Sequence, residues 1–241
     1  MARATAGRWL LFAPFAVVGA IQVASKLGPD GPLDHVSKAL CLPLLAAAAL
    51  GVLLVERRRP APATVALLGL GLLASWLGDV LIEGSFVLGL AAFLAAHLLF
   101  IAMFSAAFRR RASWWALLAI PWYLALIGIL APGLGGLLVP VLVYGAALGT
   151  MVAFSTRGGM LTTVGGILFA ASDTMIALQE FTPYLAGRVT DVPVMLTYLA
   201  AQSLLVLGVL SRLVAWPMAS SSGSAPGTSR TRRSRASRSP G

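Results

Sequence analysis

The sequence predicts an all-α integral membrane protein with eight transmembrane helices. Of its 241 residues, 59% are hydrophobic and only 11% are charged, and the mean hydropathy is +0.89. Soluble domains carry about 25% charged residues, so this composition excludes a soluble globular domain. The apolar residues also fall into runs long enough to cross a hydrocarbon core of roughly 30 Å.

The first four runs are bounded by basic residues or by a turn. The first follows Arg3 and Arg8 and ends in Val-Ala-Ser, so a signal peptide is the alternative interpretation of this run. The second ends at three consecutive arginines, and a tight Glu-Gly-Ser turn joins the third to the fourth. These runs are Trp9–Ser25, Val36–Val55, Pro62–Ile82 and Ser85–Phe108.

The last four runs follow the same rule. A second group of three arginines precedes the fifth run, Arg157 precedes the seventh, and the eighth lies between Arg188 and a polar tail. The runs are Ser113–Leu130, Leu134–Phe154, Gly159–Phe181 and Val192–Leu213.

The basic residues predict how this bundle is oriented. If the helices alternate in direction, fifteen of the 18 Lys and Arg residues fall on one side, and only Lys26, Lys38 and Arg188 fall on the other. Basic residues mark the cytoplasmic side, so both termini are expected in the cytoplasm, and the net charge of +10 does not imply a nucleic-acid partner. We expect residues 1–216 to form the transmembrane domain and residues 217–241, rich in Ser, Gly, Pro and Arg, to be a disordered basic cytoplasmic tail. The preference for Arg over Lys is typical of a GC-rich bacterial genome, which favours a multi-pass protein of the bacterial inner membrane.

The two halves of the chain resemble each other. Gly71 precedes Asp79 by eight positions, as Gly165 precedes Asp173, and the Phe-Leu-Ala-Ala-His sequence that ends at His97 is similar to the Tyr-Leu-Ala-Ala-Gln sequence that ends at Gln202. Such matches in the same order predict a parallel repeat of four plus four helices.

Polar residues inside the apolar runs are the candidate functional residues, because they are costly in a membrane and usually face the bundle interior. Asp79, His97, Asp173, Tyr198 and Gln202 are all expected in the non-cytoplasmic half of the bundle. Two of these residues also have a plainer interpretation. Asp79 could be a carboxylate that reaches the membrane interface, and His97 could be a hydrogen-bond donor in helix packing.

Other polar and aromatic residues carry weaker signals. Lys38 is either a phosphate ligand at the outer edge or a side chain that only reaches the interface. We expect Tyr144 and the tryptophans Trp114, Trp115 and Trp122 to be packing or interface residues. The chain has only His35 and His97 as histidines and no cysteine cluster, so a three-ligand zinc site is not expected, and we predict no metal and no other cofactor.

The chain resembles the YhhN family of membrane proteins from about Ser37 to Leu210. The resemblance rests on Ser37-Lys38, Leu77-Gly78-Asp79-Val80, Ala96-His97-Leu98-Leu99-Phe100, Tyr144, Ser172-Asp173, and Tyr198 with Gln202. Characterised members of that family are lysoplasmalogenases. The resemblance therefore implies hydrolysis of the vinyl ether bond of a lysophospholipid, which gives a fatty aldehyde and a glycerophospho-headgroup.

The residues suit that chemistry. A vinyl ether is cleaved when its carbon is protonated and water captures the resulting oxocarbenium ion, which requires one carboxylic acid and one carboxylate, as in glycoside hydrolysis. We expect Asp79 and Asp173 to be this pair, with His97 orienting one of them or relaying a proton. Binding roles are expected for Lys38, toward the phosphate, and for three further residues, Tyr198, Gln202 and Ser172.

Two rival functions stay open. A proton-coupled transporter of a small molecule or lipid would use the same intramembrane aspartates. A lipid-binding membrane protein without turnover would bury the same polar residues. The expected partners are a lysophospholipid substrate and the surrounding lipid, and the sequence does not indicate an oligomeric state.

Overall fold

The computed structural model describes residues 7–28, 31–55, 61–183 and 191–214. These residues form helices and turns, and no β-strand occurs among them. Short 3-10 helices, η1 (Trp114–Leu118), η2 (Gly135–Leu137) and η3 (Thr156–Gly158), flank the α6–α7 region. The α-helices are α2 (Ala13–Ser25), α3 (Pro32–Val55), α4 (Pro62–Leu81), α5 (Phe86–Ala107), α6 (Ala119–Leu134), α7 (Leu138–Ser155), α8 (Met160–Phe181) and α9 (Asp191–Leu213).

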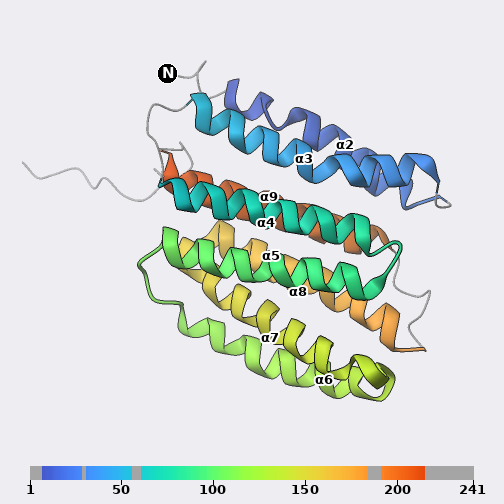
Figure 1. Ribbon diagram of the computed structural model, residues 1–241. Helices are drawn as coiled ribbons and strands as arrows, with labels where there is room; N and C mark the ends of the chain where they lie inside the picture. The colour runs from blue at the N-terminus through green and yellow to red at the C-terminus, as the bar shows by residue number, and fades with distance from the viewer. Residues whose placement is uncertain (1–6, 29–30, 56–60, 184–190, 215–241) are drawn as a thin grey trace, which may run out of the picture.

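The helices pack side by side as one bundle (Figure 1). In that view α2 and α3 lie at one edge, α6 and α7 lie at the opposite edge, and α4, α5, α8 and α9 lie between them. The most extensive contacts join α4 to α5 and α8 to α9. The all-α prediction is confirmed, and two of the four central helices, α4 and α8, carry the predicted aspartates.

Glycines let these central helices approach closely. A Cβ atom on Gly78 of α4 would lie 2.7 Å from the ring of Phe93 on α5. On the other pair, a Cβ atom on Gly165 of α8 would lie 3.0 Å from the carbonyl oxygen of Ala201 on α9. Small residues at helix contacts are the usual way in which membrane helices pack, and here they draw the aspartate-bearing helices α4 and α8 onto their neighbours.

Within the part of the chain that the structure describes, six stretches are long and apolar enough to cross a membrane. One of them is the 45-residue stretch Trp114–Gly158, in which α6 and α7 pack against each other in opposite directions, and the chain reverses at Gly135, a glycine with φ of +48°. The α2 helix has 13 residues and falls below the length of a full span. The protein is thus an integral membrane protein by its apolar helices, while eight separate crossings stay a prediction.

Several helix boundaries differ by a few residues from those predicted. The α3 helix begins at Pro32 rather than at Val36, because a proline suits the first helical position and Asp34 in the first turn favours a helix start. The fifth predicted run begins as the 3-10 helix η1 and continues as α6 to Leu134, four residues further than predicted. The earlier start of α3 places Asp34 and His35 on the helix.

The described arginines and lysines that make hydrogen bonds or ion pairs lie at opposite ends of the bundle. At one end, which we call the arginine end, Arg157 Nε donates to the Arg110 carbonyl at 2.6 Å and Arg212 Nε donates to the Gly158 carbonyl at 3.2 Å. At the other end, the lysine end, Lys26 and Lys38 form ion pairs. The arginines at 57–59, Arg188 and the predicted tail at 217–241 lie outside the described residues.

Candidate active site

The first aspartate lies in the last turn of α4. Asp79 is 5% exposed, and the hydroxyl group of Tyr198, on α9, donates a hydrogen bond to its Oδ2 at 2.8 Å. Tyr198 is itself buried. A buried carboxylate needs donors in place of water, and α9 supplies one here.

The second aspartate lies in the interior of α8, and two other helices reach it. The Tyr144 hydroxyl, on α7, donates to Asp173 Oδ2 at 2.5 Å. Nε2 of His97, on α5, lies 3.1 Å from the Tyr144 oxygen and 3.4 Å from Asp173 Oδ2. Since the Tyr144 proton is donated to Asp173, His97 is best placed as the Nε2–H tautomer that donates to Tyr144.

Tyr144 is a site residue that the sequence argument assigned to packing. Its hydroxyl links His97 to Asp173, so its role is polar as well as steric. The signal that could have identified it is its place in the YhhN-like pattern, because periodicity alone does not show which residue a tyrosine hydroxyl reaches.

Aromatic rings join the two aspartate clusters into one centre. The Tyr198 ring is in edge contact with Phe169, 5.5 Å between centroids, and with Phe93, at 6.1 Å. Phe169 in turn is in edge contact with His97 at 5.0 Å. The predicted residues Asp79, His97, Asp173 and Tyr198 are therefore brought together.

The remaining predicted binding residues differ in their surroundings. Gln202 is completely buried on α9, one turn beyond Tyr198. The Ser172 hydroxyl donates to the Val194 carbonyl at 3.1 Å, so it links α8 to α9 instead of turning toward the carboxylates.

An apolar crevice of about 40 Å³ reaches the second aspartate. Side chains from α5, α7 and α8 form most of its wall, and Asp173 is its one carboxylate, with the Tyr144 hydroxyl nearby. The rings of Phe86 and Phe181, 5.4 Å apart between centroids, also line it. The crevice thus offers apolar contact up to an acidic group.

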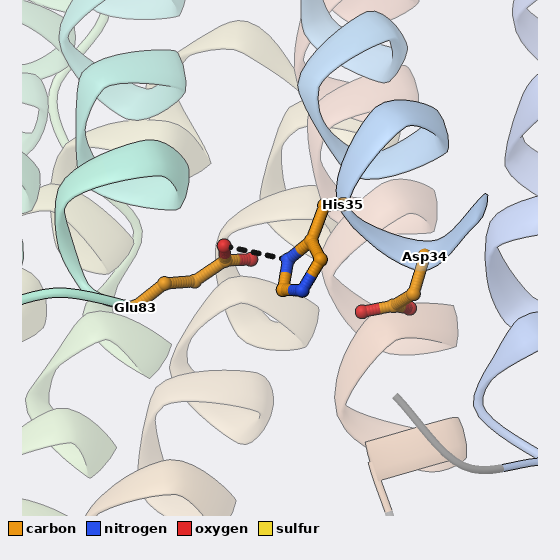
Figure 2. Close-up of side chains that lie close together, drawn as sticks. All are labelled: Asp34, His35 and Glu83. Carbon is orange, nitrogen blue, oxygen red and sulfur yellow. Dashed lines mark hydrogen bonds and ion pairs between the residues drawn. The ribbon is translucent and has the colours of Figure 1, made fainter. Parts of the chain in front are cut away.

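Lys38 lies at the lysine end, above the aspartates. Its Nζ is 3.1 Å from Glu83 Oε1, and His35 Nδ1 is 2.9 Å from Glu83 Oε2 (Figure 2). Burial alone would raise the pKa of Glu83, but the hydrogen bonds and positive charges of Lys38 and His35 outweigh it and lower that pKa below its ordinary value. The charge of Lys38 also acts on Asp79. The two basic side chains of Lys38 and His35 therefore lie beside the site, at the lysine end of the bundle.

Asp34, His35 and Glu83 form a group whose ligand atoms lie within 4.8 Å of one another, a spacing that a metal ion could use (Figure 2). The Asp34 carboxylate is already bound by three donors: Gln22 Nε2 at 3.0 Å, Ser25 Oγ at 2.8 Å and Lys26 Nζ at 2.8 Å. Glu83 is likewise paired with Lys38. Since ammonium groups already balance both carboxylates, this group is best explained as an ion-pair network that ties α2, α3 and the α4–α5 turn together.

The chain is similar to known proteins over most of its length. The chain matches the model of the YhhN family over residues 33–209. It is 34% identical over 231 residues to a lysoplasmalogenase of Mycobacterium bovis, which covers 86% of this chain and 85% of that protein. It is 31% identical over 208 residues to the pig (Sus scrofa) lysoplasmalogenase TMEM86B, with 84% and 87% covered. No solved structure is significantly similar to the chain.

Proposed function

Since the chain belongs to the YhhN family, we propose that it is a membrane-embedded hydrolase that cleaves the vinyl ether bond of a lysophospholipid. The products are a fatty aldehyde and a glycerophospho-headgroup. The observation that carries the proposal is the pair of aspartates, Asp79 buried and Asp173 with 9% of its side chain exposed, each bound by a tyrosine hydroxyl, around one aromatic centre. The related proteins named lysoplasmalogenase support it.

The reaction needs one proton donor and one proton acceptor. A protonated aspartic acid gives its proton to the outer carbon of the vinyl ether, and the electron pair of the double bond forms the new C–H bond. The positive charge that develops on the adjacent carbon and the ether oxygen is stabilised by the other aspartate, which takes a proton from the attacking water. The resulting hemiacetal then breaks at its bond to the glycerol oxygen, which takes up a proton while the hemiacetal hydroxyl loses one, and aldehyde is released.

The pair of aspartates suits this division of labour. Two carboxyl groups close together in a water-poor site hold one proton between them more readily than they hold two negative charges. One aspartate loses the proton that the other gains, so a single proton transfer between them restores the starting state. Tyr198 and Tyr144 orient the two carboxyl groups, and His97 fixes the hydroxyl of Tyr144.

We expect the substrate to lie between the apolar crevice and the lysine end. The reactive end of its alkenyl chain would lie at the apolar crevice that leads to Asp173, since a volume of about 40 Å³ is too small for the whole chain, and its phosphate would lie toward Lys38 and His35. Lys38 contributes there as a point charge. A lipid with one reactive polar bond between an apolar chain and an anionic headgroup matches this order of surroundings.

The proposal includes a membrane topology. The eight helices α2–α9 would each cross the membrane, with both termini and the arginine end in the cytoplasm, because basic residues favour that side. A parallel repeat that relates α2–α5 to α6–α9 is supported by the two close pairs α4–α5 and α8–α9, each with glycines on the aspartate-bearing helix. The tyrosine partners come from α9 and α7, so the repeat would not extend to these hydrogen bonds.

Purified protein incubated with an alkenyl lysophospholipid tests the function. We expect release of fatty aldehyde, and no release of fatty acid from the matching acyl lysophospholipid, since an ester does not react by protonation at carbon. Substrate flux into proteoliposomes without product would favour the transporter instead. Binding without either result would indicate a lipid-binding protein.

A further inference from the structure

Two buried polar side chains beside the Asp79–Tyr198 pair lack hydrogen-bond partners. Ser75 Oγ and both amide atoms of Gln202 make no hydrogen bond of ordinary geometry with the described residues, although both side chains are completely buried. Most proteins satisfy such groups, because an unpaired buried polar atom is costly. Each such exception requires an explanation.

The orientation of Ser75 is unusual for this bundle. Hydroxyl groups inside these helices commonly donate to a carbonyl three or four residues earlier on the same helix, the usual way to satisfy such a group. Residues that do so are Ser105, Thr150, Thr174, Thr197, Ser203 and Ser211. Ser75 does not, so its hydroxyl is available to a group outside its own helix.

Ser75 and Gln202 each lie one helical turn from the Asp79–Tyr198 hydrogen bond, on the same faces of their helices. The α4 helix runs toward the lysine end and α9 runs toward the arginine end, and Asp79 meets Tyr198 between them. Ser75 lies four residues before Asp79, and Gln202 lies four residues after Tyr198. Both steps lead one helical turn toward the arginine end on the same helix faces. The Gln202 amide is close enough to the Tyr198 hydroxyl for a long, weak hydrogen bond, although it makes none of ordinary geometry. Both side chains therefore lie on the faces that carry the Asp79–Tyr198 pair.

A water molecule fits what these groups require. A buried water typically makes two to four hydrogen bonds to polar groups that would otherwise be unsatisfied, and a hydroxyl with an amide offers both donors and acceptors. We infer that Ser75 and Gln202 bind an internal water molecule beside Asp79, and that this water is the one consumed in the hydrolysis. The second part of the inference rests on the proposed function.

The position of the water assigns a different catalytic role to each of the two aspartates. Asp79, next to the water, takes its proton as the water oxygen bonds to the oxocarbenium carbon. Asp173, which forms part of the wall of the apolar crevice, gives its proton to the vinyl ether carbon in the preceding step. The bonds balance: one O–H bond of water breaks, one C–O bond forms, and the proton moves to Asp79.

The water itself is tested in an experimental structure at a resolution that shows ordered solvent. We expect a density peak within hydrogen-bond distance of Ser75 Oγ and of the Gln202 amide, and its loss in the Ser75→Ala, Gln202→Leu double variant. A direct Ser75–Gln202 hydrogen bond with no peak would overturn the water site. This readout does not depend on activity, so it decides the site even if the wild-type protein releases no aldehyde.

The role of the water is tested by competition with methanol, which captures the same cation as a mixed acetal. Ser75→Ala and Gln202→Leu should lower kcat roughly tenfold, about the factor that one hydrogen bond is worth, leave KM unchanged, and raise the fraction of mixed acetal. Ser203→Ala is the matched control, because the Ser203 hydroxyl is bonded to its own helix at the Leu199 carbonyl. Gln202→Met replaces Gln202→Leu if the latter fails to fold.

Wild-type kcat and wild-type product partition in folded Ser75 and Gln202 variants would contradict the role of the water, while the release of aldehyde by the wild-type protein would still support the proposed function. A wild-type protein that releases no aldehyde would contradict the proposed function itself.

Discussion

Each aspartate of the site has a neutral hydroxyl group as its bonded partner. Tyr198 donates to Asp79 and Tyr144 donates to Asp173, and no described Lys or Arg pairs directly with either carboxylate. A lysine or arginine in contact would hold a carboxylate ionised and unable to donate a proton. A tyrosine orients the carboxyl group and leaves both of its protonation states available, which acid and base catalysis requires.

This arrangement predicts the effect of removing one hydroxyl. Tyr198→Phe and Tyr144→Phe should each lower kcat by about 10- to 100-fold, the range that a hydrogen bond to a charged group is worth. Tyr123→Phe is the control, because the Tyr123 hydroxyl donates to the Leu142 carbonyl, outside the aspartate pair. Steady-state aldehyde release measures all three, and equal losses in the three variants would show a packing effect instead.

Glu83 gives a prediction for stability against pH. Its pKa is lowered in the folded protein by Lys38 and His35, so the unfolded chain binds more protons, and the ion pairs stabilise the fold above the ordinary pKa of about 4.5. That stabilisation is lost as the pH falls through the lowered pKa. Glu83→Gln should therefore reduce the Tm modestly at pH 7, since exposed ion pairs contribute about 0–1 kcal/mol.

The Tm values of the wild-type protein and the Glu83→Gln variant should converge once the pH is below the lowered pKa of Glu83. Thermal unfolding in detergent at several pH values gives the comparison, with Glu180→Gln as a matched carboxylate on α8. A Tm difference that persists unchanged at low pH would mean that Glu83 does not act through its charge.

Between elements, the close contact of α4 with α5 positions the site. Phe93 packs on Gly78 and also contacts the rings of Tyr198 and Phe169. A displacement of Phe93 is therefore passed on to the partner of Asp79. Gly78 thus sets the distance between α4 and α5 and, through Phe93, the position of the aromatic rings around the site.

Gly78→Ala tests this contact. The added Cβ would lie 2.7 Å from the Phe93 ring, so the helices or the ring must shift, and we expect a loss of stability of about 1–3 kcal/mol, typical of overpacking, together with reduced kcat. Gly69→Ala, on the same helix with no atom within 4 Å of the added Cβ, should keep wild-type activity. Thermal unfolding and aldehyde release separate the two, and a harmless Gly78→Ala would show that the contact does not position the site.

For the molecule as a whole, the separation of arginines from lysines predicts the orientation of the bundle in the membrane. The described arginines Arg110, Arg157 and Arg212 lie at one end, and Lys26 and Lys38 lie at the other. Reporter fusions at Arg58, Arg110 and the C-terminal tail should report a cytoplasmic location. Fusions near Asp30 and Glu83 should report an external location. An external C-terminus would contradict the eight crossings.

The sequence predicts the helices and the central polar residues well, for a physical reason. Apolar runs long enough to span a membrane must be helical, and intramembrane aspartates such as Asp79 and Asp173 must face the interior. Partners across helices depend on the rotation and register of each helix, which one sequence does not give. For this reason the bond of Tyr144 to Asp173 and the bond of Ser172 to Val194 were not foreseen.

The same limit applies to the outer end of the site. Lys38 was predicted to meet a phosphate, and the structure pairs it with Glu83, which lies 45 positions away in the chain. Gln22 and Asp34 were not expected to bond, because the start of α3 was placed after Asp34. Both contacts follow from how α2, α3 and the α4–α5 turn meet.

The most direct test compares aldehyde release from an alkenyl lysophospholipid by wild-type protein, Asp79→Asn, Asp173→Asn and the double variant, each shown to be folded. If the aspartates act as one unit, each single variant should retain less than about 1% of kcat, and the double variant should be little worse than the worse single variant, because groups that act together are non-additive. Folded single variants that both retain near-wild-type hydrolysis would contradict the two-aspartate mechanism and place the catalytic group elsewhere.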